Sequence, residues 1–212
     1  MKSRVTTGVR WRPTFLLCLA VLAGCGSGSG ARHTALLELT PIGMRTVATP
    51  DFSIQIPKGW RSLDRRSAVR PSRIRPFLKT NPRLRTELQA FTGPNSPIEL
   101  LAVSPVGAAF RANMNVIQTR IPKSLSFDTL AKNEATQIKA VTVVHDLRQS
   151  TVELAAGRAL RLVYRVRRNG VVFQYFVKHE GFLYVLTYTA ALAAASHYGP
   201  VFDTSAHTFA LR

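Results

Sequence analysis

The chain has 212 residues, of which 46% are apolar and two are cysteine. This length and apolar content fit one folded domain with a sizeable core, and they exclude both an intrinsically disordered chain and a small disulfide-framed scaffold. The 29 Lys and Arg residues outnumber the 11 Asp and Glu residues, and the resulting formal charge of +18 favours anionic partners over cationic ones.

The first 24 residues have the organisation of a bacterial lipoprotein signal peptide. A basic start without acidic residues precedes an apolar run at 15–22 that is too short to span a bilayer. Leu22-Ala23-Gly24-Cys25 then matches a lipoprotein cleavage site, which predicts a mature chain that begins with a diacylglycerol-modified Cys25. The alternative is cleavage after Ala23 by ordinary signal peptidase, which leaves Cys25 unmodified.

A Gly/Ser tract directly follows Cys25 and predicts a flexible tether over residues 25–45, ahead of one domain over residues 46–212. Two acyl chains hold a protein stably at a membrane, so we expect a monomeric domain anchored to the outer face of the cell membrane. The other cysteine, Cys18, leaves with the signal peptide, and no thiol then remains for a disulfide or for nucleophilic catalysis.

The domain begins with a predicted strand and a predicted broken helix. Apolar and polar residues alternate over residues 51–60, until Pro57 and Gly59 end the run, which predicts a short half-buried strand. Apolar residues at helical spacing predict a helix over residues 73–91, which Pro76 and Pro82 must kink or divide.

Residues 58–85 include ten Lys or Arg residues and a single acidic residue, so their charge forms a patch or a stripe. We predict that this basic face binds anionic envelope components, either lipid headgroups or phosphate-bearing wall polymers, or an acidic protein. Nucleic acid is excluded by the location and by the lack of a recognition module. A solvated face that reflects codon usage is the alternative. The candidate binding residues are Arg61, Arg65, Arg66, Arg70, Arg73 and Arg75, with Arg161, Arg165 and Arg167 further along the chain.

The middle of the chain predicts two strands and one capped helix. Residues 98–103 and 113–121 are strand-like because apolar and β-branched side chains dominate them. Ser126 is a typical N-cap and predicts a helix up to Ala140. Its predicted apolar face consists of Phe127, Leu130, Ala131 and Ile138.

The last third predicts successive hairpins followed by helix. Strands are expected at 141–147, 150–154 and 158–167, and the last of these places Arg161, Arg165 and Arg167 on one face. Asn169-Gly170 is typical of a type I′ turn into a strand at 171–177. Glu180-Gly181 predicts a second turn, into a strand at 182–189. A small-residue helix is then expected from Ala190, broken at Gly199-Pro200 and continued toward His207.

These elements define the predicted fold class. Successive hairpins with helices in separate runs predict an α+β domain in which helices sandwich one antiparallel sheet, and they exclude a doubly wound nucleotide-binding fold.

Five short motifs of the chain resemble the PsbP-like family, with the closest likeness to small lipoproteins of high-GC Gram-positive bacteria. They are Phe52-Ser53-Ile54-x-Ile56-Pro57-x-Gly59-Trp60, Ala112-Asn113-Met114-Asn115-Val116, Leu154-Ala155-Ala156-Gly157-Arg158-Ala159, Gly181-Phe182-Leu183-Tyr184-Val185-Leu186-Thr187-Tyr188-Thr189 and Phe202…Phe209. The similarity covers residues 46–211, and the arginine-rich residues 61–85 depart from the family pattern. The resemblance implies an α-β-α sandwich and a role in binding, assembly or envelope maintenance instead of catalysis.

The sequence contains no pattern typical of an active site, so we predict no enzymatic activity, no cofactor and no metal. The five histidines are scattered and lack metal-ligand spacing. A Gly-x-Ser-x-Gly motif is absent, and the carboxylates are dispersed along the chain. His145 and Asp146 are adjacent, which points their side chains to opposite faces of a strand.

An alternative function depends on aromatic residues of the last strands. Their spacing of two favours a place in the core, but the same residues could instead line a cleft for an apolar-ligand carrier or a minor hydrolase. They are Tyr164, Phe173, Tyr175, Phe176, Phe182, Tyr184 and Tyr188.

Overall fold

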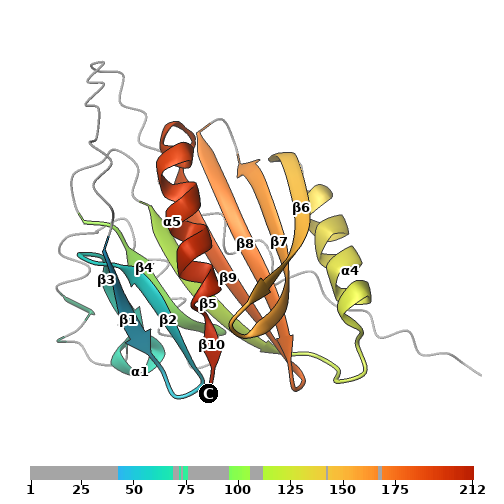
Figure 1. The fold of residues 1–212 in the computed structure, drawn as a ribbon, viewed down its shortest axis with the longest axis horizontal. Helices are drawn as coiled ribbons and strands as arrows, with labels where there is room; N and C mark the ends of the chain where they lie inside the picture. Colours follow the sequence, from blue (N-terminus) through green and yellow to red (C-terminus); the bar gives the residue numbers. More distant parts are fainter. Residues whose placement is uncertain are drawn as a thin grey trace, which may run out of the picture.

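The computed structural model describes residues 43–68, 72, 74, 75, 96–105, 112–141, 143–166 and 169–212. These residues form a large antiparallel sheet, a small antiparallel sheet and two main helices (Figure 1). The predicted broken helix at 73–91 and the signal peptide and tether lie almost entirely outside the described residues. No helix in the described part is long and apolar enough to cross a membrane.

The large sheet has seven strands in the order β3-β4-β5-β9-β8-β7-β6, and every neighbouring pair is antiparallel. The strands are β3 (Arg61–Asp64), β4 (Ile98–Val103), β5 (Asn113–Arg120), β6 (Val144–Leu154), β7 (Gly157–Val166), β8 (Gly170–His179) and β9 (Phe182–Ala191). β8 lies inside the sheet and is buried on both faces from Gly170 to Val177, whereas β6 is an edge strand with mostly exposed side chains.

The small sheet has three strands, with β2 (Phe52–Pro57) between β1 (Met44–Ala48) and β10 (Ala210–Leu211). The predicted first strand is therefore confirmed, and its alternating Phe52, Ile54 and Ile56 are fully buried. β2 does not join the large sheet, because its two edges are taken by β1 and by the end of the chain. β1 includes Met44, so regular structure begins within the last residues of the predicted tether.

The large sheet has a different cover on each face. Helix α4 (Phe127–Lys139) packs through Leu130 and Ile138 on one face. Helix α5 (Ala195–His207) and the small sheet together cover the other face, where Phe202 and Phe52 belong to the same apolar cluster. The prediction of an α+β antiparallel fold is confirmed, but the helices do not sandwich the sheet alone: a three-stranded sheet supplies part of one layer. The two remaining helical segments are short, α1 (Arg65–Ala68) and η4 (Leu192–Ala194).

Several predicted boundaries are confirmed by local geometry. The Ser126 side chain accepts a hydrogen bond of 3.1 Å from the Thr129 amide, so α4 starts at its predicted cap. The strands predicted at 98–103 and 113–121 correspond to β4 and β5. The two strands predicted at 141–147 and 150–154 are instead one strand, β6, with a bulge between His145 and Arg148 where Asp146 has a φ of 52°.

The two predicted hairpin turns have different outcomes. Glu180 and Gly181 both have positive φ, 44° and 83°, and they join His179 to its partner Phe182 as a two-residue turn. Gly170 is not in a type I′ turn, because it pairs with Val166 as the first residue of β8 and has no positive φ. The connection there is longer than two residues, so the Asn-Gly pair does not occupy the tip.

The break predicted at Gly199-Pro200 is wrong, since α5 continues from Ala195 through Pro200 to His207. An internal proline removes one backbone hydrogen bond and crowds the preceding turn. Tertiary packing offsets this cost, because Phe202 and Ala206 are buried against the sheet and Gly199 lies against the ring of Phe173. β9 also extends to Ala191, which leaves no helix at Ala190.

Candidate functional site

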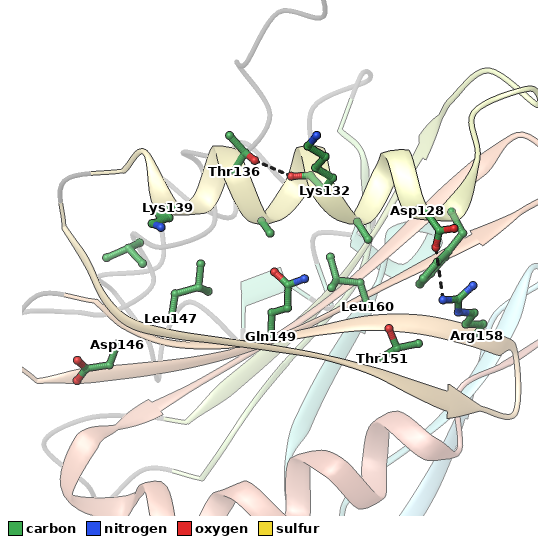
Figure 2. Close-up of a pocket in the computed structure, with 14 residues that line it drawn as sticks. Asp128, Lys132, Thr136, Lys139, Asp146, Leu147, Gln149, Thr151, Arg158 and Leu160 are labelled. Atoms are coloured by element: carbon green, nitrogen blue, oxygen red, sulfur yellow. Dashed lines mark hydrogen bonds and ion pairs between the residues drawn. The ribbon is translucent and has the colours of Figure 1, made fainter.

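A groove of about 730 Å³ lies between α4 and the edge strand β6 (Figure 2). Its origin is the size of the α4 residues that face β6. Leu130 and Ile138 fill the space over the sheet interior, whereas Ala131 and Ala135 on the adjacent face leave space over the edge. The sequence therefore forms the groove by placing small side chains on one flank of an amphipathic helix.

The groove has a floor of mixed apolar and polar side chains and a charged rim. Leu147, Gln149 and Thr151 rise from β6 toward the helix, beside Leu160 of β7 (Figure 2). Lys132, Thr136 and Lys139 form the helix side of the rim. The remaining lining residues are Phe127, Asp128, Ala131, Ala135, Val144, Asp146 and Arg158.

Both acidic residues of the rim already have partners within the protein. Asp128 Oδ1 lies 3.4 Å from Arg158 Nη2, and the same guanidinium lies 4.3 Å from the centre of the Phe127 ring. Asp146 forms an ion pair with Arg165 of β7. Within the described residues neither Lys132 nor Lys139 has an ion pair, so the rim presents uncompensated positive charge.

The first group of candidate arginines lies beside acidic residues. Arg65 and Arg66 line a hollow of about 540 Å³ with Asp51, Asp64 and Glu99. Arg65 Nη1 is 2.9 Å from Glu99 Oε1. Burial raises the pKa of Asp64, but hydrogen bonds from Ser67 outweigh it, so the pKa lies below its ordinary value and the carboxylate stays charged.

Other members of this group have more exposed positions. Arg61, at the start of β3, and Arg66 and Arg75 are exposed. Arg70 and Arg73 lie outside the described residues, as do Arg167 and the proposed lipidation site Cys25.

Arg161 and Arg165 form a second group, on the α5 side of β7. Five strand spacings separate β7 from β3, roughly 24 Å at about 4.8 Å per step, so the described members of the two groups do not form one continuous patch across the sheet. The second group is also largely neutralised: Arg161 pairs with Asp203 of α5 through contacts of 2.9 and 3.1 Å, and Arg165 pairs with Asp146.

The Arg161–Asp203 pair belongs to a partly buried polar cluster that the sequence did not indicate. The Tyr175 hydroxyl donates to Asp203, and burial together with this carboxylate raises the pKa of Tyr175. Nearby, the Tyr188 hydroxyl donates to Ser205 over 3.0 Å, and Ser205 donates to the Gln55 carbonyl of β2. The cluster joins α5 to both sheets, and its Tyr175 is fully buried, so we interpret it as structural.

The predicted place of the aromatic residues in the core is confirmed for six of the seven, and Phe182 is only partly buried against the cluster under α5. Phe173, Tyr175, Tyr184 and Tyr188 belong to the cluster under α5, whereas Tyr164 and Phe176 belong to the cluster under α4. Tyr164 and Phe173 both line a hollow of about 510 Å³ beside α5, but the other five aromatic residues do not, so the set does not line one cleft. Within the described part of the chain, no group of three or more His, Cys, Asp or Glu residues could hold a metal ion.

Sequence reasoning missed the groove residues, although their spacing carried a signal. Ala131 and Ala135 are four apart, and Lys132 and Lys139 are seven apart, so each pair shares a helix face. The missing information was that β6 would lie opposite that face.

The antiparallel sheet with α4 on one face and with α5 and a small sheet on the other defines a PsbP-like fold. Among solved structures, the chain is similar to PsbP (CyanoP) of the cyanobacterium Synechocystis sp. PCC 6803, with a TM-score of 0.56 and 14% identity over 88% of this chain and 99% of that one. It is also similar to LpqN of Mycobacterium tuberculosis, a protein involved in cell envelope biogenesis, with a TM-score of 0.51 and 11% identity over 81% of this chain and 92% of that one.

At these identities the likeness concerns the fold alone. No protein-family profile and no curated protein sequence matches the chain. The closeness to small lipoproteins of Gram-positive bacteria stays a prediction.

Proposed function

We propose that this protein is a lipid-anchored, non-catalytic binding domain of the bacterial cell envelope, and that the groove between α4 and β6 holds its partner. The observation that carries this proposal is the groove itself, which combines apolar side chains, among them Leu147 and Leu160, with two lysines that lack ion pairs within the described residues. Binding sites commonly combine an apolar surface with a few polar groups that orient the partner. The envelope role of LpqN and the lipoprotein-like start of this sequence support the location.

Two neighbouring residues of β6 provide a matched test of the groove. Gln149 and Ser150 are both exposed, but their side chains point to opposite faces of the strand, and only Gln149 lines the groove. A photoreactive amino acid in place of Gln149 should cross-link a defined envelope component in living cells, and the same amino acid at Ser150 should not. Equal products from both positions, or none from either, would contradict the groove as a binding site.

The anchor is tested separately with Cys25→Ala. The native protein should fractionate with membranes and carry the added mass of a diacylglycerol, whereas the variant should lose both properties. A native protein that is unmodified at Cys25 would disprove lipidation and leave the groove proposal intact.

The arginine-rich surface is a second proposed contact, with anionic headgroups or wall polymers. It is favoured by Arg66 and Arg75, which are exposed and have no ion pair within the described residues. Its neighbours Asp51, Asp64 and Glu99 reduce the local charge, so we rank it behind the groove.

A further inference from the structure

The outer edge of β6 is the longest open strand edge in the described part of the protein. β6 has 11 residues and pairs only with β7 among the described strands. A strand at the end of a sheet presents a row of backbone N–H and C=O groups without sheet partners. The bulge between His145 and Arg148 disturbs the first residues, so regular pairing is available over residues 149–154, about 20 Å at roughly 3.3 Å per residue.

This edge and the groove are parts of one surface. A strand added beyond β6 would point every second side chain toward the α4 side of the sheet, as Gln149 and Thr151 do. There it would meet the flank of α4 formed by Ala131 and Ala135, whose small side chains leave the required space. The geometry therefore provides main-chain pairing and side-chain space together, the two parts of recognition by strand addition.

The rim charges select the chemistry of the added strand. Among the groove's lining residues, Asp128 and Asp146 are paired with arginines of the protein itself, which leaves Lys132 and Lys139 as the available charges. Glu153 is the one acidic residue of 149–154; it is exposed near the end of that segment and does not line the groove. Both side chains are exposed and long enough to turn toward a neighbour. The floor mixes apolar Leu147 and Leu160 with polar Gln149 and Thr151, which suits alternating side chains better than a continuous acyl chain.

We propose that the β6 edge binds an extended acidic segment of a partner protein, which pairs with residues 149–154 and places its carboxylates beside Lys132 and Lys139. This inference rests on the proposed function, since it specifies the occupant of the same groove. It requires no conformational change in the described strands, because the edge and the groove are already open.

The test begins with a randomised peptide display library selected on the purified native protein in detergent. The selected peptides should be acidic, poor in proline and alternating, because proline removes a backbone donor and disturbs pairing. In fluorescence anisotropy, Lys132→Glu with Lys139→Glu should weaken binding of a selected peptide by roughly tenfold or more. Lys58→Glu with Lys178→Glu makes the same change in net charge away from the groove and should leave the affinity nearly unchanged.

A second measurement follows the backbone directly. Bound peptide should slow amide hydrogen exchange in residues 149–154, and N-methylation of alternate peptide residues on the pairing side should abolish both protection and binding. The proposal would be overturned if the protected amides lay elsewhere or if no peptide were selected. It would also be overturned if the selected peptides were basic or proline-rich, or if both double variants weakened binding equally. A fatty-acid probe that occupies the groove and displaces the peptide would assign the site to an amphiphile and also overturn it.

Loss of the groove as a binding site and loss of strand addition would give different results. Cross-linking from Gln149 without peptide binding would leave the groove as a binding site and remove strand addition. Peptide binding without a cross-linked envelope component would retain strand addition as a property of the domain and remove the proposed cellular role.

Discussion

Glu134 lies on the sheet-facing side of α4, between Leu130 and Ile138, and is only 9% exposed. No hydrogen bond or ion pair reaches its carboxyl within the described part of the chain. Burial disfavours the charged form and raises the pKa of Glu134 from 4.5 to about 7. We therefore predict that Glu134→Gln, which keeps the size and removes the ionisation, stabilises the protein at neutral and higher pH.

The direction and the pH window follow from this pKa. Below pH 4.5 the carboxyl is neutral in the folded and unfolded states, so ionisation costs no stability. Between 4.5 and about 7 only the unfolded state loses the proton, and the free energy of unfolding falls as pH rises. At about 1.4 kcal/mol per pKa unit, the loss is about 3.5 kcal/mol and is complete above pH 7.

The assay is urea denaturation of the native protein and of Glu134→Gln over this pH range. The two free energies of unfolding should agree below pH 4.5 and diverge to about 3.5 kcal/mol above pH 7. Glu153→Gln changes an exposed glutamate of β6 and should follow the native curve. Parallel curves for the native protein and Glu134→Gln would show that this carboxyl ionises normally, and would refute the reasoning.

Three further predictions concern the cluster at α5, two glycines and the arginine-rich surface. In urea denaturation, Asp203→Asn should lower the free energy of unfolding by about 1–2 kcal/mol, because it leaves Arg161 partly buried without its partner. The control Asp128→Asn changes a carboxylate that is 83% exposed and should lower it by less than about 0.5 kcal/mol. Gly181→Ala should lower the melting temperature, because Gly181 has a φ of 83° and a Cβ would lie 3.0 Å from Lys123 Cγ. Gly199→Ala should maintain or raise the melting temperature, because its Cβ would make only ordinary contact with Phe173. If the arginine-rich surface binds anionic envelope components, binding to anionic vesicles should fall steeply with salt and be lost on substitution by Gln, and vesicle binding that ignores both changes would contradict this role. The residues to substitute are Arg65, Arg66, Arg70, Arg73 and Arg75.

Local chemistry made much of the fold predictable. Ser126 indicated the start of α4 because an N-cap satisfies amides only a few residues away. The alternation over β2 and β7 indicated strands because side chains on successive residues must point to opposite faces. The Glu180-Gly181 turn was predictable for the same reason, since two positive φ values close a hairpin within two residues.

Errors arose where distant contacts decided the outcome. β2 belongs to a separate sheet because Ser53 and Phe52 pair with Ala210 and Leu211 at the far end of the chain, which no local pattern shows. α5 continues through Pro200 because its apolar face is held by the sheet and by β2. In both cases tertiary packing overrode a local tendency.

The candidate site was harder to predict because charge in a sequence does not reveal pairing. Arg161 and Arg165 do share a strand face, as the alternation required, but that face meets Asp203 from α5 and Asp146 from the bulge of β6. Those acids come from 42 residues later in the chain and from the neighbouring strand, so only the folded arrangement neutralises the arginines. Lys132 and Lys139 show the opposite result. Nothing in the helix sequence distinguishes them, yet they have no ion pairs in the described structure. A partner can therefore use only the charge that remains after pairing within the protein. That charge lies at the rim of the α4–β6 groove and not on the arginines of β7.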